Sequence, residues 1–277
     1  MDASPHISDR VRQVVVFVLS LVAIAGAFLG SGALGGTPIQ DAAGGALASD
    51  STLIAPAGAA FSIWSVIYLG LLAYAVWQLF PSQAARDVHR RVGYLLALSM
   101  LLNAAWIGVV QLGLIGVSVV VIAVLLAVLG VIFVKLQRAR AEAAPRSVGI
   151  VQSVVLDGTV GLYLGWVTIA TAANIAAWLT DIGFRGFDIE PQAWGVAVVA
   201  IAALVGVATA IFSHGRFTPA LALAWGLGWL AVARISGEPA SQLVGITAVI
   251  AAAAVLITAV TRRIVAERER RRVEIRV

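Results

Sequence analysis

The feature that most constrains this chain is a series of long apolar runs, each about the length of a membrane-spanning helix. Crossing about 30 Å of hydrocarbon takes roughly 20 helical residues. Eight runs approach or exceed this length: 14–34, 57–79, 92–115, 117–134, 150–179, 193–213, 217–233 and 243–260. The runs are apolar on all sides, whereas the strands of a transmembrane barrel would alternate. We therefore predict an all-α polytopic membrane protein with eight transmembrane helices, and a tight hairpin at the glycine-flanked break 113–116.

Composition narrows the classes of protein and site that remain. Hydrophobic residues make up 61% and charged residues 12% of the chain, which is outside the range of soluble proteins. Because cysteine is absent, disulfides, thiolate nucleophiles and Cys-built metal sites are excluded. His6, His89 and His214 lie far apart in an expected tail or loop, so no metal site is predicted.

The basic residues predict an orientation. The net charge of +5 could suggest a nucleic-acid partner, but the basic residues lie in short loops and a terminal tail, so we expect none. A cytoplasmic N-terminus places 17 of the 19 Lys and Arg residues inside, leaving Arg185 and Arg234 outside. We expect a multi-pass protein of the bacterial cell membrane with both termini cytoplasmic. The first run is longer than the apolar core of a signal peptide and should be retained.

Two loop regions have open interpretations. The first outer loop, 35–55, is rich in Gly, Ala and Ser, with Asp41 and Asp50 and no basic residue. It is either a flexible connector or a lid over a binding site. The tail 261–277 is expected to extend the last helix and to contact anionic lipid headgroups.

Polar and aromatic side chains recur at helical spacing in three of the runs. Phe61, Trp64 and Tyr68 share a face of the second, Asn103 and Trp106 lie i, i+3 in the third, and a stripe from Tyr163 to Trp178 follows the fifth. At about 1.5 Å per residue, these side chains lie in the outer half or near the midplane. They predict an aromatic pocket for a flat apolar ligand, opening outward under the 35–55 loop. The predicted ligand-binding residues are Phe61, Trp64, Tyr68, Asn103, Trp106, Tyr163, Trp166, Ala170 and Asn174.

An alternative explanation of the same side chains remains open. Trp and Tyr form belts at bilayer interfaces, and intramembrane asparagines join helices by hydrogen bonds. For Trp77 and Trp194, near the ends of runs, we predict the interface belt.

These motifs resemble the TspO/MBR family, the tryptophan-rich sensory proteins related to the peripheral benzodiazepine receptor. The resemblance is carried by Pro56 with the aromatic residues after it, by L-N-x-x-W at 102–106, and by Y-x-x-W-x-x-x-A-x-x-x-N-x-x-x-W at 163–178. Prolines usual in the family are replaced by Ala59 or Ala60, Ile63 and Leu162. The resemblance implies a five-helix unit whose cavity, closed by the loop after the first helix, binds protoporphyrin IX, haem or, in some members, sterols. Tetrapyrroles are expected as ligands, and no cofactor is required.

The resulting division is an N-terminal cytoplasmic tail (1–13), a TspO-like five-helix unit (14–180), a three-helix extension (181–260) and a basic tail (261–277). We expect the extension to be structural. Glycine pairs such as Gly26 with Gly30 and Gly161 with Gly165 permit close helix contacts within the chain or between two copies, so a homodimer stays open.

The functional prediction is a receptor, sensor or carrier for a planar hydrophobic ligand, with membrane lipid as the other partner. The alternative is an ion- or proton-coupled secondary transporter of a small hydrophobic solute, with Asp157 as the coupling residue. The competing interpretation is a structural role for Asp157, hydrogen-bonded or paired with an arginine at the contact between the five-helix unit and the three extra helices. No run supplies a nucleophile and base pair, so an enzyme is not favoured, although oxidation or photochemistry of a bound tetrapyrrole stays open.

Overall fold

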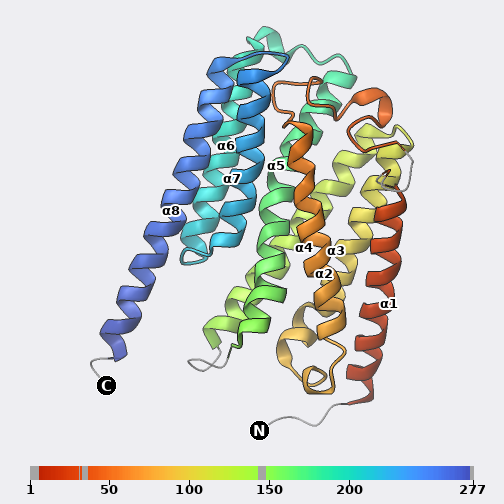
Figure 1. The fold of residues 1–277 in the computed structure, drawn as a ribbon, viewed down its shortest axis with the longest axis vertical. Helices are drawn as coiled ribbons and strands as arrows, with labels where there is room; N and C mark the ends of the chain where they lie inside the picture. Colours follow the sequence, from red (N-terminus) through yellow and green to blue (C-terminus); the bar gives the residue numbers. More distant parts are fainter. Residues whose placement is uncertain (1–5, 31, 33–36, 143–147, 275–277) are drawn as a thin grey trace. The chain divides into compact units, whose positions relative to one another are not determined.

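The structure, a computed structural model, describes residues 6–30, 32, 37–142 and 148–274. Within these residues the chain forms eight long helices and no strand (Figure 1). The helices are α1 (Ile7–Gly30), α2 (Ile63–Trp77), α3 (Asp87–Gln111), α4 (Ile115–Glu142), α5 (Thr159–Asp181), α6 (Pro191–Phe212), α7 (Phe217–Ser236) and α8 (Gln242–Glu274). All eight are long and apolar enough to cross a membrane, α2 when the 3₁₀-helical stretch Gly58–Ser62 before it is included, which confirms the predicted fold class.

The helix bounds follow the apolar runs with informative differences. The hairpin between α3 and α4 contains Gly113 at φ 72°, a left-handed conformation that glycine adopts without steric strain. Helix α1 begins at Ile7 rather than at residue 14, because polar contacts described below hold its first turns. The predicted end of the first run lies outside the described residues. At the other terminus, α8 continues to Glu274, as expected for a tail that extends the last helix.

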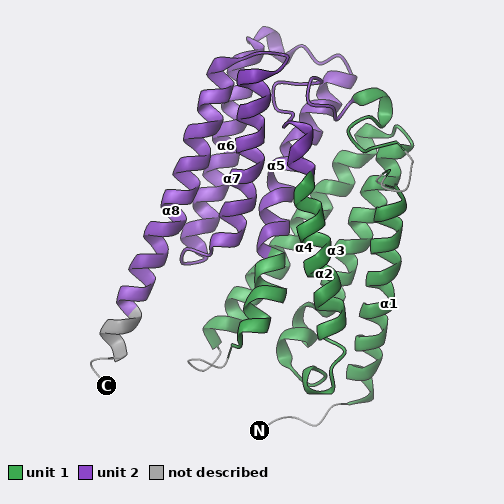
Figure 2. Ribbon diagram, viewed as in Figure 1, with its two compact units in different colours: residues 1–45, 62–160 green, residues 46–61, 161–277 purple. Residues whose placement is uncertain are grey.

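The helices form two compact units, each described here by itself (Figure 2). Unit 1 comprises Met1–Gly45 and Ser62–Val160. In it, α3 packs against both α1 and α4, and α2 packs against α1 and against a π-helical stretch, Gln152–Gly158, that precedes α5. Gly30 of α1 allows a close approach, since a Cβ there would lie 2.6 Å from Cγ2 of Ile107 in α3.

Unit 2 comprises Ala46–Phe61 and Gly161–Val277. Helix α8 packs against α6 and α7, which also contact each other. Gly165 of α5 faces the backbone of Pro219 in α7, and Gly206 of α6 leaves room for Leu223 and Val255. The boundary between the units falls within α5, at residues 160 and 161, and the division near residue 180 implied by the resemblance stays a prediction.

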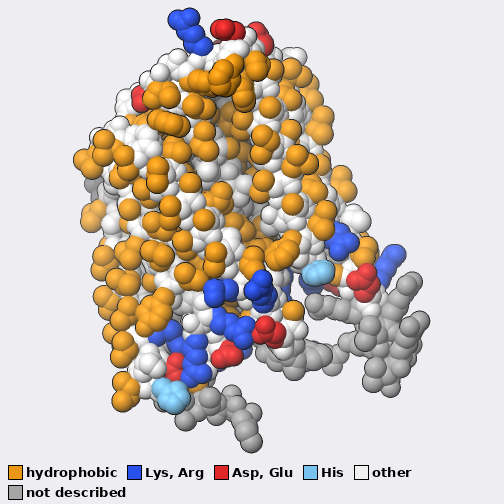
Figure 3. Space-filling view, turned by 180° about the vertical axis from the view of Figure 1, so that it is seen from behind, with side chains coloured by type: hydrophobic (Ala, Val, Ile, Leu, Met, Phe, Trp, Pro, Cys, Tyr) orange, Lys and Arg blue, Asp and Glu red, His pale blue; other side chains and the backbone are white. Residues whose placement is uncertain are grey.

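The helix surfaces are those expected of a chain surrounded by lipid. Large hydrophobic side chains are exposed along the helices, including Leu69 (68%) and Val120 (62%) in unit 1 and Leu204 (67%) in unit 2. Figure 3 shows hydrophobic side chains over the helix faces and Lys and Arg side chains gathered near helix ends. Exposed apolar surface of this extent would favour aggregation in water and is stable in a bilayer.

Candidate functional site

Four of the predicted ligand-binding residues lie in unit 1, and three of them contact one another. The rings of Trp64 and Tyr68, one turn apart on α2, are stacked with centroids 5.2 Å apart and an interplanar angle of 20°. The Tyr68 hydroxyl accepts a hydrogen bond of 2.7 Å from Nδ2 of Asn103 on α3. Trp106, one turn after Asn103, is buried. The predicted common face of α2 and α3 is therefore an aromatic and amide cluster that joins the two helices.

The buried amide of Asn103 has one polar atom without a hydrogen-bond partner among the described residues. Its side chain is 1% exposed, and its Oδ1 has no hydrogen-bond partner in the part of the chain that the structure describes. If the amide were turned over, Oδ1 could accept from the Tyr68 hydroxyl and Nδ2 would be left instead. One buried polar atom beside the stacked rings is thus open in either orientation. Buried polar groups without a partner are uncommon in folded proteins and call for an explanation.

The other five predicted residues lie in unit 2. Phe61 meets the ring of Trp166 edge to face, with centroids 5.7 Å apart. Tyr163, Trp166 and Asn174 of the α5 stripe are each at most 2% exposed, and Ala170 is half-buried. The stripe is a buried face of α5, and its assignment to a ligand stays a prediction.

The second half of the predicted lid loop is packed against α7 in unit 2. We call residues 46–61 the docked segment. Arg234, near the end of α7, is fully buried, and its guanidinium donates to the backbone oxygens of Ser49 and Thr52 in this segment. The indole Nε1 of Trp225 donates to the backbone oxygen of Ala60 (2.9 Å), and the backbone N–H of Ala57 donates to that of Trp229 (3.1 Å). Helix α7 thus anchors the segment that leads into α2.

The role of Arg234 was missed by the sequence analysis, which placed this residue in an outer loop and treated the last three helices as structural. The available signal was an arginine near the end of an apolar helix. A charged side chain there faces protein or headgroups, because exposure to hydrocarbon is costly.

A family model described as TSPO-like protein matches residues 15–261. The chain belongs to the TSPO-like family. The match runs through α6, α7 and most of α8, so the family pattern continues past residue 180, where the residues that carry the resemblance end. Membership indicates a multi-pass membrane protein of the sensor or receptor type. No curated protein and no solved structure matches the chain significantly.

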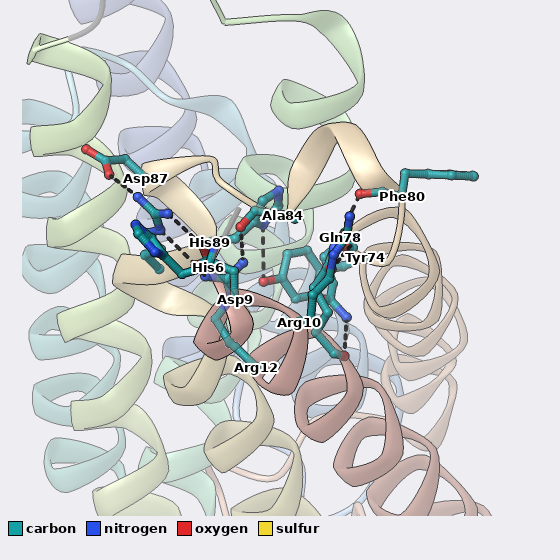
Figure 4. A network of polar contacts seen from close by, with 12 residues as sticks. His6, Asp9, Arg10, Arg12, Tyr74, Gln78, Phe80, Ala84, Asp87 and His89 are labelled. Carbon is teal, nitrogen blue, oxygen red and sulfur yellow. Dashed lines mark hydrogen bonds and ion pairs between the residues drawn. The ribbon is translucent and has the colours of Figure 1, made fainter. Parts of the chain in front are cut away.

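This TSPO-like chain also contains a buried polar network in unit 1 that the sequence did not predict (Figure 4). Asp9, in the first turns of α1, accepts hydrogen bonds from Arg12 Nη1 (2.8 Å) and Arg90 Nε (2.8 Å), and Arg12 Nη2 donates to the backbone oxygen of Ala84 (2.6 Å). Gln13 and Gln78 each donate through Nε2 to the other's backbone oxygen. Two guanidinium groups compensate the buried carboxylate, and the network fixes the start of α1 on the segment between α2 and α3.

His89 belongs to the same region, and its expected place in a loop is wrong. It lies in the first turn of α3 and is fully buried. Its Nε2 lies 3.2 Å from Oε1 of Gln83, which can only accept, and its Nδ1 lies 3.5 Å from the hydroxyl of Tyr74. The ring also meets Trp77 edge to face at 4.9 Å, so Trp77 packs on protein as well as lying near a helix end. Among the described residues no group of three His, Asp or Glu side chains could hold a metal ion.

Asp157 has an arginine partner within unit 1. It forms an ion pair with Arg140 of α4, whose Nη2 also donates to Ser153 Oγ (2.9 Å). Both acceptors lie in the π-helical stretch before α5, where the wider turn changes which side chains align. The pair favours the structural interpretation of Asp157, with the partner on α4 rather than on the last three helices.

Proposed function

We propose that this TSPO-like chain is a membrane receptor, sensor or carrier that binds a planar hydrophobic ligand, with tetrapyrroles such as protoporphyrin or haem as the first class to test. The family indicates the sensor or receptor type, and the predicted aromatic residues supply the stacking surface. Bacterial origin and cytoplasmic termini remain part of the same proposal.

The observation that carries the proposal is the cluster of Trp64, Tyr68 and Asn103 in unit 1. Two stacked rings, both only partly buried, present flat apolar surface, and the amide beside them has an open polar atom. A planar ligand with a polar group at its edge matches both features. Flat surface supplies most of the affinity, while a few convergent polar atoms orient the ligand.

The first experiment measures quenching of tryptophan fluorescence by protoporphyrin IX, haem, a bilin and a sterol, using the purified chain in nanodiscs. Trp64→Phe and Trp106→Phe each keep an aromatic ring but lose stacking area and the indole N–H. Each substitution should weaken binding several-fold, because an aromatic contact contributes about 0.5–1.5 kcal/mol beyond its buried area. Trp166→Phe tests the α5 stripe in the same way.

Trp77→Phe and Trp194→Phe are the matched controls. Trp77 contacts His89, and Trp194 donates to the backbone oxygen of Gly186 in the α5–α6 loop, so neither belongs to the predicted site. Their affinities should equal that of the parent. Equal binding by all five variants, or no binding of any tested ligand by the parent, would refute the proposal in favour of the transporter alternative. Uptake of the same compounds into vesicles under a pH gradient tests that alternative directly.

The second experiment separates ligand orientation from helix joining at Asn103. Asn103→Leu and Tyr68→Phe both remove the interhelical hydrogen bond, so each should lower the free energy of unfolding by about 1 kcal/mol without ligand. Only Asn103→Leu removes the amide itself. If the amide orients the ligand, the rise in melting temperature on adding protoporphyrin IX shrinks in Asn103→Leu and persists in Tyr68→Phe. Equal rises in both variants would assign Asn103 to helix joining alone.

A further inference from the structure

Arg234 connects two loops of unit 2 through one buried side chain. Its Nη1 donates to the backbone oxygens of Thr52 (2.9 Å) and Pro239 (3.0 Å), and its Nη2 donates to those of Ser49 and Glu238. Two acceptors belong to the docked segment and two to the loop between α7 and α8. The guanidinium therefore holds a segment from the first outer loop beside a loop almost 190 residues later in the chain.

The bonding pattern makes this side chain decisive for the position of the docked segment. A guanidinium offers five N–H donors in a rigid plane, so one residue can satisfy several carbonyl groups at fixed angles. All four acceptors are backbone oxygens, and each loses its bond to the guanidinium when Arg234 is replaced. In the docked segment, the carbonyl groups of Ser49 and Thr52 would regain a hydrogen bond by opening to water.

The docked segment also makes two single hydrogen bonds to α7, at Ala57 and Ala60. The carboxylates of Asp50 in the segment and Glu238 in the opposite loop lie close enough to act electrostatically on the guanidinium. The charge of Arg234 thus attracts both loops, while its planar group fixes their backbones.

We propose that Arg234 is a latch that keeps the docked segment closed on α7, and that opening of this latch sets the rate at which ligand enters and leaves. The latch is supported by the set of hydrogen bonds that Arg234 makes within unit 2. The link to ligand exchange rests on the proposed function and on the prediction that the loop 35–55 is a lid, to which the first residues of the docked segment belong. Helix α7 would then regulate ligand exchange through the docked segment, in addition to packing against α6 and α8.

The test of the latch uses a label and needs no ligand. Because the chain has no cysteine, Leu47→Cys introduces a single thiol, at a position that is 8% exposed within the docked segment. Its reaction rate with a membrane-impermeant maleimide reports how often the segment opens. Adding Arg234→Gln to this background should raise the rate at least about tenfold, since charged hydrogen bonds are lost. Arg234→Lys keeps the charge but loses the planar group and should give an intermediate rate.

Two further variants keep the test decisive. Arg185→Gln removes the same charge from an exposed side chain in the α5–α6 loop, outside the docked segment and its contacts, and should label at the parent rate. Trp225→Phe removes one hydrogen bond of the docked segment and keeps an aromatic side chain, so it should raise the rate about threefold or more even if Arg234→Gln does not fold. A labelling rate in Arg234→Gln equal to that of the parent would overturn the latch. If Arg234→Gln does not fold, parent labelling rates in both Arg234→Lys and Trp225→Phe would overturn it.

The second measurement follows association and dissociation of protoporphyrin IX in the same variants by fluorescence quenching. An opened latch should speed both rates by a similar factor and leave the dissociation constant within about twofold. A merely structural role would lower the fraction of folded protein and leave both rates unchanged. Faster labelling with unchanged exchange rates would overturn the gating role. Absence of binding in the parent would refute the proposed function, and the labelling rates would still decide the latch.

Discussion

Several charged side chains within the helices have partners inside the chain, and for Asp157 the partner bears on its function. Asp157 is 8% exposed at its side chain and pairs with Arg140, which is 25% exposed. A carboxylate that couples ion movement to transport has to change its partners during the cycle, whereas the Asp157 side chain is held by Arg140 within unit 1. The pair therefore makes Asp157 a stabilising residue of unit 1.

Replacing one member of this pair should cost more than replacing both. Asp157→Asn leaves the Arg140 guanidinium partly buried without its carboxylate, so the free energy of unfolding in detergent should fall by about 1–3 kcal/mol. Arg140→Gln should have a similar effect, and the double variant should recover part of the loss, because no uncompensated charge remains. Melting temperatures of the four proteins check this. Additive losses, or pH-driven uptake that disappears in every Asp157 variant, would instead support a coupling role.

A contact could be predicted from the sequence only when both partners are side chains whose residue type and spacing indicate it. Helical spacing placed Trp64 and Tyr68 on one face and identified Asn103 opposite them, and the structure brings these three together. Arg234 was missed because its partners are backbone oxygens, which carry no residue signature. The same holds for Arg12, which bonds the backbone oxygen of Ala84. His89 was misplaced because α3 begins before its apolar run does.

The helices were predicted better than single contacts. The thickness of the hydrocarbon layer fixes their length, and the absence of water there requires every backbone polar group to be hydrogen-bonded. The eight runs therefore became eight helices. Their ends depend on polar contacts, as at α1, where the Asp9 and Arg12 pair extends the helix beyond its apolar run. The π-helical stretch Gln152–Gly158 had no counterpart in the predictions, which assumed α-helical spacing throughout this run.

The glycines predicted to permit close helix contacts do so within the chain. A Cβ on Gly165 would lie 2.9 Å from the carbonyl carbon of Pro219 and 3.0 Å from Cβ of Ala222 in α7. Backbone cannot rotate away as a flexible side chain would, so Gly165→Ala should lower the free energy of unfolding by about 1–3 kcal/mol. Gly228→Ala in α7 is the control, because nothing lies within 4 Å of its added Cβ.

The measurement is thermal unfolding in detergent at two protein concentrations. Gly228→Ala should be neutral or slightly stabilising, since alanine favours helix over glycine by about 1 kcal/mol. The effect of Gly165→Ala should not depend on concentration if its contact is internal. A concentration-dependent melting temperature, or a change from dimer to monomer, would show that Gly165 packs between copies.

At the scale of the whole molecule, the balance of charges across the membrane is the strongest remaining prediction. Family membership and eight apolar helices make the chain a multi-pass membrane protein. The distribution of basic residues predicts which side of the membrane each loop faces, which neither family membership nor helix length indicates. Lys and Arg are retained on the cytoplasmic side during insertion, whereas Asp and Glu have little influence. With both termini inside, only Arg185 and Arg234 of the 19 basic residues lie outside, and burial of Arg234 leaves Arg185 as the one exposed cation of the described outer loops.

Reporter fusions test this orientation at each level of the chain. A reporter inserted at residue 145, between α4 and α5, or attached after residue 277 should be active on the cytoplasmic side. Reporters at residues 45 and 187, in the loops before α2 and between α5 and α6, should be active outside. Phe187 is 79% exposed, so an insertion there should leave the helices intact. If one span failed to insert, every later loop would change sides, and the first reporter position that changed would show where the failure occurred. A cytoplasmic reading at 145 with an outside C-terminus would place that failure within α5–α8, among the helices that hold the docked segment.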